Sequence, residues 1–98
     1  MSRDVLGQFQ AWYLERCNDE WEHSYGVNIT TLDNPGWTVD VDLADTPLSG
    51  RPYERVETHR SEDDWLVSWR EEARWCAACG PLNLSEALAA FLDWGRSP

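Results

Sequence analysis

A short turn signal between two alternating segments is the feature that most constrains the fold of this chain. Residues 33–37 read DNPGW. Pro35 fixes φ at the first central position of a tight turn, and Gly36 supplies the positive φ that a type II turn needs next. Apolar residues occupy every second position on both sides of the turn: Tyr25, Val27 and Ile29 before it, and Trp37, Val39, Val41 and Leu43 after it. Because side chains alternate across a strand, this pattern predicts two half-buried antiparallel strands joined by a tight reversal.

Further strand signals follow these two segments. Residues 45–52 contain two prolines and a glycine and are expected to form a loop. A third strand is expected over 53–59, although its alternation is weak. Residues 65–69 alternate again and predict a fourth strand. Two glutamates at 71–72 are expected to turn the chain into a short last strand over 74–78.

Helical periodicity replaces the alternation towards both ends of the chain. A first helix is expected over 4–17, with Asp4 at its start. A second is expected from its cap at Asn83, which with Glu86 resembles a capping box, to a stop at Gly95. Their apolar stripes are Val5, Leu6, Phe9, Trp12, Tyr13 and Cys17 in the first, and Leu84, Ala87, Leu88, Phe91 and Leu92 in the second. The order predicts an α+β fold in two layers, with an antiparallel sheet of about four or five strands flanked by an N-terminal and a C-terminal helix, in a single domain over 1–98.

Charge restricts the classes of partner. Asp and Glu number 18 against 8 basic residues, all of them arginines, so the formal net charge is -10. Such a surface repels nucleic acid and anionic membranes and attracts basic proteins; the alternative is that acidity only keeps the chain soluble. The sequence has no apolar run long enough to span a membrane, no visible secretory signal and three cysteines, an odd number. These features favour a cytoplasmic protein with reduced thiols.

Cys76 and Cys79 are the strongest candidates for chemistry. To form a metal site, they would need Cys17 and either His23 or His59 as further ligands. Residues three apart in a strand point to opposite sides of the sheet, which suits neither metal nor redox chemistry. The chain has no nucleophile-elbow motif and no glycine-rich phosphate loop. We therefore expect no enzyme activity, no cofactor and no bound metal.

Carboxylates and tryptophans are the candidate binding residues. An acidic face or rim that could fill the basic active-site cleft of another protein is predicted from seven residues: Asp40, Asp42, Glu62, Asp63, Asp64, Glu71 and Glu72. For each of them the alternative is a solvated position without a partner. Trp12, Trp37 and Trp65 are expected in the core. One or two of the remaining four, Trp21, Trp69, Trp75 and Trp94, are candidates for exposed anchors, since tryptophan is enriched at binding hot spots.

Several short motifs resemble those of a known protein family. They are WEHSYG at 21–26, DNPGW at 33–37, DDW at 63–65, NL at 83–84 and FLDW at 91–94. With this spacing the chain resembles the immunity protein 53 family over nearly its whole length. The resemblance implies a small α+β immunity component of a bacterial polymorphic toxin system, with no cofactor and no catalytic residues. The motif residues are expected to be mainly structural: Trp21, Glu22, Tyr25, Asp33, Asn34, Pro35, Gly36 and Trp37.

The chain departs from the family pattern at two places. Cys76 and Cys79 stand where small residues are usual in the family, and the turn at 71–73 lacks the glycine often found there. The predicted function is an immunity protein that neutralises a cognate toxin, with a basic nuclease as the favoured target, by occlusion. The alternatives are a small-ligand or adaptor module with an aromatic cleft near Trp21, Trp37 and Trp65, and a Cys/His metal protein. The oligomeric state stays open.

Overall fold

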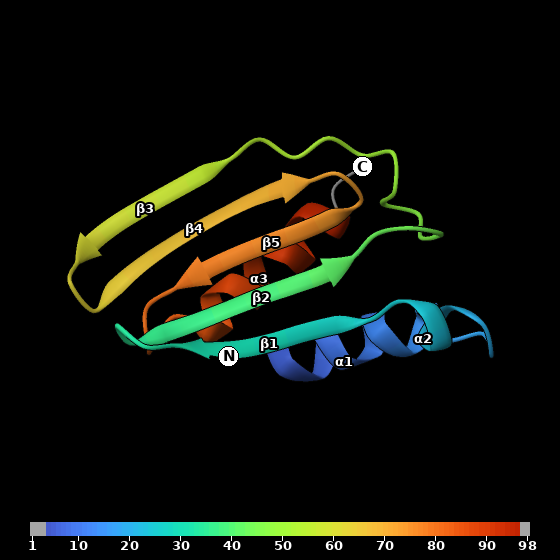
Figure 1. Ribbon diagram of the computed structural model, residues 1–98, viewed down its shortest axis with the longest axis horizontal. Helices are drawn as coiled ribbons and strands as arrows, with labels where there is room; N and C mark the ends of the chain where they lie inside the picture. Colours follow the sequence, from blue (N-terminus) through green and yellow to red (C-terminus); the bar gives the residue numbers. More distant parts are fainter. Residues whose placement is uncertain (1–3, 97–98) are drawn as a thin grey trace.

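The computed structural model describes residues 4–96, which form one antiparallel sheet and three helices. In chain order the elements are α1 (Val5–Arg16), α2 (Trp21–Ser24), β1 (Val27–Leu32), β2 (Gly36–Asp42), β3 (Val56–Ser61), β4 (Asp64–Glu71), β5 (Arg74–Cys79) and α3 (Leu84–Arg96). The strand order across the sheet is β1-β2-β5-β4-β3. The sheet thus joins two hairpins, β1–β2 and β3–β4, through β5 (Figure 1). The predicted α+β fold is confirmed.

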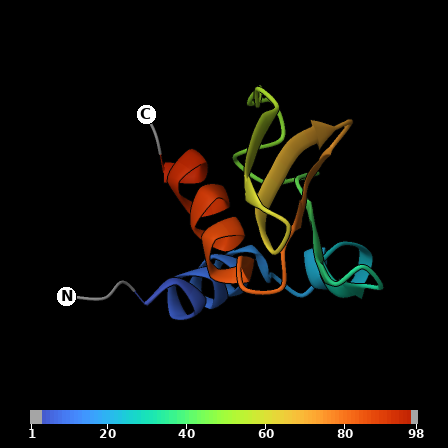
Figure 2. The same ribbon diagram turned by 90° about the vertical axis from the view of Figure 1, so that its left-hand side faces the viewer.

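Both long helices lie on one side of the sheet (Figure 2). Alternate side chains of the central strands point into this layer and are almost fully buried: Val39, Val41, Leu66, Trp75, Ala77 and Cys79. Phe91 of α3 lies at the centre, with ring centroids 5.1 Å from Trp75, 4.9 Å from Trp12 and 5.8 Å from Phe9. Aromatic rings at such edge-on distances add to the stability from area burial alone. The helix α1 is therefore held mainly through the aromatic side chains that it shares with α3.

The first helix begins as predicted but buries a narrower stripe. The Asp4 carboxylate accepts a hydrogen bond from the Gly7 backbone N–H at 2.9 Å, which satisfies one of the unpaired donors of the first turn. Val5 and Phe9 are buried, whereas Leu6 and Tyr13 of the predicted stripe are exposed. One face of α1 is therefore free of packing partners in the sheet.

The predicted first strand starts too early, because a one-turn helix, α2, precedes it. The Glu22 carboxylate accepts hydrogen bonds from the backbone N–H groups of Asn18 and Asp19, and its pKa is lowered by backbone donors. The Trp21 indole is buried and donates to the Ala44 carbonyl at 2.9 Å. Tyr25 consequently lies outside β1. Glu22 thus holds the 17–20 loop, and Trp21 ties α2 to the chain just beyond β2.

Gly36 is required for a reason other than the one predicted. None of the described glycines has a positive φ, so Gly36 does not occupy the left-handed position of a type II turn. It is the first residue of β2, opposite Leu32, and a Cβ atom placed on it would lie 2.2 Å from the Cys79 carbonyl oxygen. The reversal is made by residues 33–35, and glycine lets the backbone of β5 approach β2.

Two further boundaries differ from the prediction. The third strand begins at Val56 rather than Tyr53, whose hydroxyl instead lies 2.6 Å from the buried Ser68 hydroxyl of β4. Gly95 does not end the last helix but lies inside α3, where a Cβ atom would contact Leu48 at 3.3 Å. Asn83 precedes α3 as expected. Its side chain, however, binds Asp64 and Glu86 and accepts from the Trp65 N–H, in place of the reciprocal backbone contacts of a capping box.

Candidate functional site

The side of the sheet opposite α1 and α3, here called the open face, has no helix packed over its central strands (Figure 2). Strand register and the alternation of side chains assign fourteen residues to it: Asn28, Thr30, Thr38, Asp40, Asp42, Glu57, His59, Trp65, Val67, Trp69, Glu71, Arg74, Cys76 and Ala78. Its centre is apolar, because Val67 pairs with Ala78 and Trp69 pairs with Cys76 across β4 and β5. The open face therefore combines an apolar strip with carboxylates along its borders.

Four of the seven predicted carboxylates lie at one end of the open face. Asp42 ends β2 and Asp40 precedes it by two residues, while Glu71 ends β4 and Glu72 follows it in the β4–β5 turn. A hollow of about 430 Å³ is lined by Tyr25, Asp42, Glu71, Glu72, Arg74 and two alanines. We call this group of four carboxylates the acidic end. Arg74 offsets part of the negative charge of the acidic end, because its Nε lies 3.5 Å from an Asp42 carboxylate oxygen.

Hydrogen bonds fix the shape of the acidic end. The second Asp42 oxygen accepts from the Gly26 backbone N–H at 2.9 Å. Arg70 reaches from β4 to the Glu72 carbonyl at 2.9 Å and also binds carbonyl oxygens of Leu48, Ser49 and Arg51. Glu72 itself has φ 53°, which places it in the left-handed region that a residue with a Cβ adopts rarely. The turn thus presents two adjacent carboxylates on a backbone that is held in position.

The other three predicted carboxylates lie at the far end of β4. Glu62 and Asp63 are exposed in the β3–β4 turn, and Asp64 opens β4. Because β4 has eight residues, its ends are roughly 24 Å apart at about 3.4 Å per residue. Arg60 binds Asp64 at 2.7 Å and Glu86 at 2.6 Å, and these contacts lower the pKa of both carboxyl groups. The seven carboxylates are thus divided between two ends of the sheet, and Asp64 is already neutralised.

Two tryptophans lie on the open face. Trp65 is predicted in the core, but it is half-buried on this face with its ring 6.5 Å from that of His59 and nearly parallel to it. Trp69 is also half-buried there, and the Arg55 guanidinium lies 5.4 Å from its ring centroid. Segment 65–69 reads WLVSW, and it is Leu66 and Ser68 that point to the helices. The hydrophobic pattern predicts the opposite orientation, because three large apolar side chains share the open face while the polar Ser68 faces the helices.

The remaining tryptophans have structural contacts. Trp75 and Trp21 are buried, while Trp12, Trp37 and Trp94 are half-buried against the core. The indole N–H of Trp37 donates to the Pro81 carbonyl, and that of Trp94 donates to the Pro52 carbonyl, each at 3.0 Å. Trp37 and Trp65 lie on opposite faces of the sheet. The aromatic cleft expected near Trp21, Trp37 and Trp65 is therefore not formed by these three residues.

The two strand cysteines point to opposite faces. Cys79 belongs to the core beneath the helices, whereas Cys76 lies on the open face beside Asp40. Burial and the neighbouring Asp40 carboxylate raise the pKa of the Cys76 thiol to about 12. Burial likewise raises the pKa of the Cys79 thiol. The two thiols cannot bind one metal ion, and residues 4–96 contain no group of three His, Cys, Asp or Glu side chains arranged as metal ligands.

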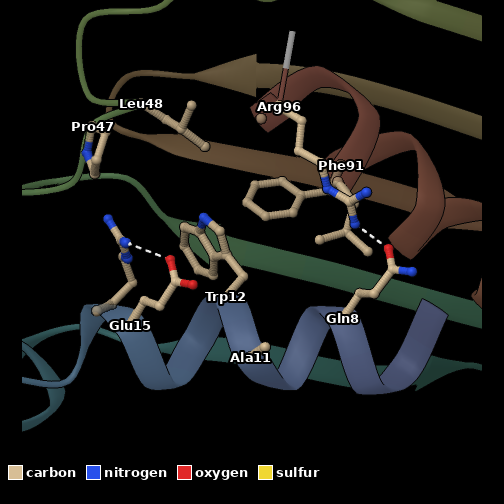
Figure 3. Close-up of a pocket in the computed structure, with 11 residues that line it drawn as sticks. Gln8, Ala11, Trp12, Glu15, Pro47, Leu48, Phe91 and Arg96 are labelled. Carbon is tan, nitrogen blue, oxygen red and sulfur yellow. Dashed lines mark hydrogen bonds and ion pairs between the residues drawn. The ribbon is translucent and has the colours of Figure 1, made fainter. Parts of the chain in front are cut away.

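A second hollow lies on the helical side, between α1, α3 and the 47–48 loop (Figure 3). Its volume is about 470 Å³, and Trp12, Leu48 and Phe91 supply its apolar wall. The Arg16 guanidinium lies 5.5 Å from the Trp12 ring centroid and is also paired with Glu15. The hollow is thus bordered by side chains that already have protein partners.

Comparison with known proteins identifies the family of this chain. The family model described as immunity protein 53 matches residues 6–96, which spans α1 to the end of α3. The chain belongs to the immunity protein 53 family. Comparisons with curated proteins and with solved structures gave no match. Membership in the immunity protein 53 family supports a role as an immunity protein with a toxin partner and suggests a non-enzymatic role. No helix within residues 4–96 is long and apolar enough to cross a membrane.

Proposed function

We propose that this chain neutralises a cognate toxin of a bacterial polymorphic toxin system by binding to it in the cytoplasm and covering its active site. The observation that carries the proposal is the family match over residues 6–96. The acidic character of the open face agrees with it, because an acidic surface accelerates encounter with a basic protein. The favoured target is a basic nuclease, whose substrate cleft must attract phosphate groups. The chain itself makes and breaks no bond.

We propose that the acidic end is where the toxin first docks. Two arginines, Arg70 and Arg74, contact the residues of this group of four carboxylates, and Glu71 and Glu72 are exposed. The opposite group at 62–64 is a weaker candidate because Arg60 neutralises Asp64. The half-buried Trp69 of the adjoining strip supplies an anchor that slows release once charges have brought the partners together. The family-motif residues Trp21 and Glu22 support the loop behind this end and need not contact toxin.

Rescue of cells tests the function. The toxin encoded beside this gene is expressed with and without the chain, and the purified pair is examined for a stable complex. We expect growth only when both are present, and a complex of defined stoichiometry. A toxin that kills equally in both cases and forms no complex contradicts the proposal.

Two matched double variants test the position of the site. Glu71→Lys with Glu72→Lys changes the charge at the acidic end, and Glu62→Lys with Asp63→Lys makes the same change at the other end of β4. All four side chains are exposed, so the variants differ in position alone. At low salt we expect the first to slow association roughly 10–100-fold and the second to slow it by less than about threefold. Equal effects would mean that net charge acts without a local site.

A further inference from the structure

The outer edge of β1 presents unpaired backbone groups. The Asp42 N–H donates to the Gly26 carbonyl at 3.0 Å, so Gly26 faces β2. In an antiparallel pair, residues alternate between those that bond to the partner strand and those that point away. Asn28 and Thr30 therefore face β2, while the N–H and C=O groups of Val27, Ile29 and Thr31 point away from the sheet. Four consecutive residues, 28–31, are exposed.

The two edges of the sheet differ in their protection. Natural edge strands are usually guarded against pairing by charged side chains, bulges or short length. The β3 edge reads VETHRS, carries Glu57, His59 and Arg60, and has a register shift between His59 and Ser61. The β1 edge reads VNITTL, has no charged residue and pairs with β2 in regular register over six residues. The β1 edge is the one on which another strand can be added.

A groove beside β1 offers space for the side chains of an added strand. Its volume is about 310 Å³, and it is lined by Phe9, Gln10 and Tyr13 of α1 and by Gly26 and Val27 where β1 begins. Tyr13 is 40% exposed and Ile29 is 38% exposed, both on the side of the sheet that α1 occupies. An extended segment paired with β1 would direct alternate side chains into this groove.

We propose that β1 receives an extended segment of the cognate toxin as an additional strand of the sheet. The toxin segment places apolar side chains in the groove beside α1. Its basic side chains point to the open face, where Asp40 and Asp42 lie on β2, the strand next to β1. The rest of the toxin then adjoins the acidic end, because Asp42 binds Gly26, the residue just before β1. This inference rests on the proposed function and specifies how the toxin is held.

Charge selects a toxin segment over a second copy of the chain as the occupant. Pairing two copies through β1 would bring together two chains that each carry a net charge of -10. A basic partner meets the same edge with attraction instead of repulsion. Self-pairing is nevertheless a distinct outcome: light scattering during gel filtration would report a dimer that β1 variants abolish, and this result would overturn the assignment of the edge to the toxin.

Variants in β1 test the added strand in the full complex. Thr31→Pro removes an outward N–H without touching the β1–β2 hydrogen bonds, and Thr31→Val keeps that N–H. We expect Thr31→Pro to raise Kd for the toxin roughly 10–100-fold and Thr31→Val to change it by less than about threefold. The matched edge pair is Ile29→Lys and Val56→Lys, two β-branched residues of similar exposure, at 38% and 46%. Only Ile29→Lys should weaken binding. Circular dichroism checks that each variant is folded.

Hydrogen exchange separates this mode of binding from the proposed function. In the complex, the amides of Val27, Ile29 and Thr31 should exchange at least about tenfold more slowly than in the free chain, as hydrogen-bonded amides do. A tight complex without this protection overturns the added strand and leaves the immunity role intact. If no toxin binds, a synthetic peptide of alternating lysine and valine tests the edge alone. Shifts of those three amides in the NMR spectrum of the chain support edge pairing, and their absence at millimolar peptide contradicts it.

Discussion

Replacement of Gly36 tests the close approach between β2 and β5. In Gly36→Ala the new Cβ would lie 2.2 Å from the Cys79 carbonyl oxygen. Carbon and oxygen ordinarily come no closer than about 3.3 Å, so the two strands must separate by about 1 Å. Donor and acceptor atoms at this end of the ladder then move from about 2.9 Å to nearly 3.9 Å, which is beyond hydrogen-bond range. The contact involves backbone on one side, and no flexible side chain can yield.

The loss of one or two buried backbone hydrogen bonds, together with strain, sets the magnitude. We expect Gly36→Ala to lower the free energy of unfolding by about 2–4 kcal/mol. For a domain of this size that corresponds to a fall in Tm of roughly 10–20 °C. Urea denaturation followed by tryptophan fluorescence measures it. The control is Gly50→Ala, because its new methyl carbon would meet no atom within 4 Å beyond its chain neighbours; it should be neutral or stabilising by up to about 1 kcal/mol.

Gly36→Asn distinguishes close approach from a positive φ. At the left-handed position of a type II turn, asparagine is the best replacement for glycine. If backbone proximity is the cause, Gly36→Asn should be at least as destabilising as Gly36→Ala. An asparagine variant that is clearly more stable than the alanine variant would refute the reasoning.

Three further predictions follow from local contacts. In the folded chain at pH 8 a thiol reagent should modify the partly exposed Cys17 quickly, and it should reach Cys76 and the third thiol only after unfolding; labelling of two or more thiols in the folded chain contradicts their burial. Arg60→Ala should destabilise the chain at pH 5–7. Because Arg60 lowers the pKa of two carboxyl groups whose ordinary values are 3.8 and 4.5, their stabilisation is present above those values and disappears as pH falls through the lowered ones. The difference in stability from the wild type should therefore begin to shrink at about pH 4 and disappear only at lower pH, and a constant difference down to pH 2 would be inconsistent with it. Glu72→Gly should raise the free energy of unfolding by about 0.5–1 kcal/mol by relieving a positive φ, whereas Glu72→Ala should not, as calorimetry can test.

Local patterns are sufficient to predict most of the elements. The helical stripes predict α1 and α3, and the alternation in 37–43 predicts β2 with its buried Val39 and Val41. The sequence patterns do not predict the four-residue α2, because side-chain bonds from Glu22 to the preceding loop and from Trp21 to the distant Ala44 stabilise it. Likewise, periodicity contains no information about which strands become neighbours. The pairing of β2 with β5 joins residues nearly 40 positions apart, and only tertiary packing decides it.

The candidate site is less predictable than the fold. The acidic residues of the β4–β5 turn and of β2 come together because the strands that carry them lie side by side with β5, and this requires the strand order. Segment 65–69 places Trp65, Val67 and Trp69 on one side and Leu66 and the polar Ser68 on the other, so periodicity favours the core for Trp65, and this placement is wrong. The proposed docking residues and the structural role of the family motif stay predictions until a toxin complex is tested.

The packing of α1 on α3 has a consequence for synthesis. Phe9 and Trp12 reach their partner, Phe91, only when the last helix has been translated and released from the ribosome tunnel. Until then the apolar side of the sheet is uncovered, and the first helix lacks its contacts with Phe91. A chain that stops before α3 therefore leaves Phe9, Trp12 and the apolar side of the sheet uncovered, and we expect such a fragment to aggregate.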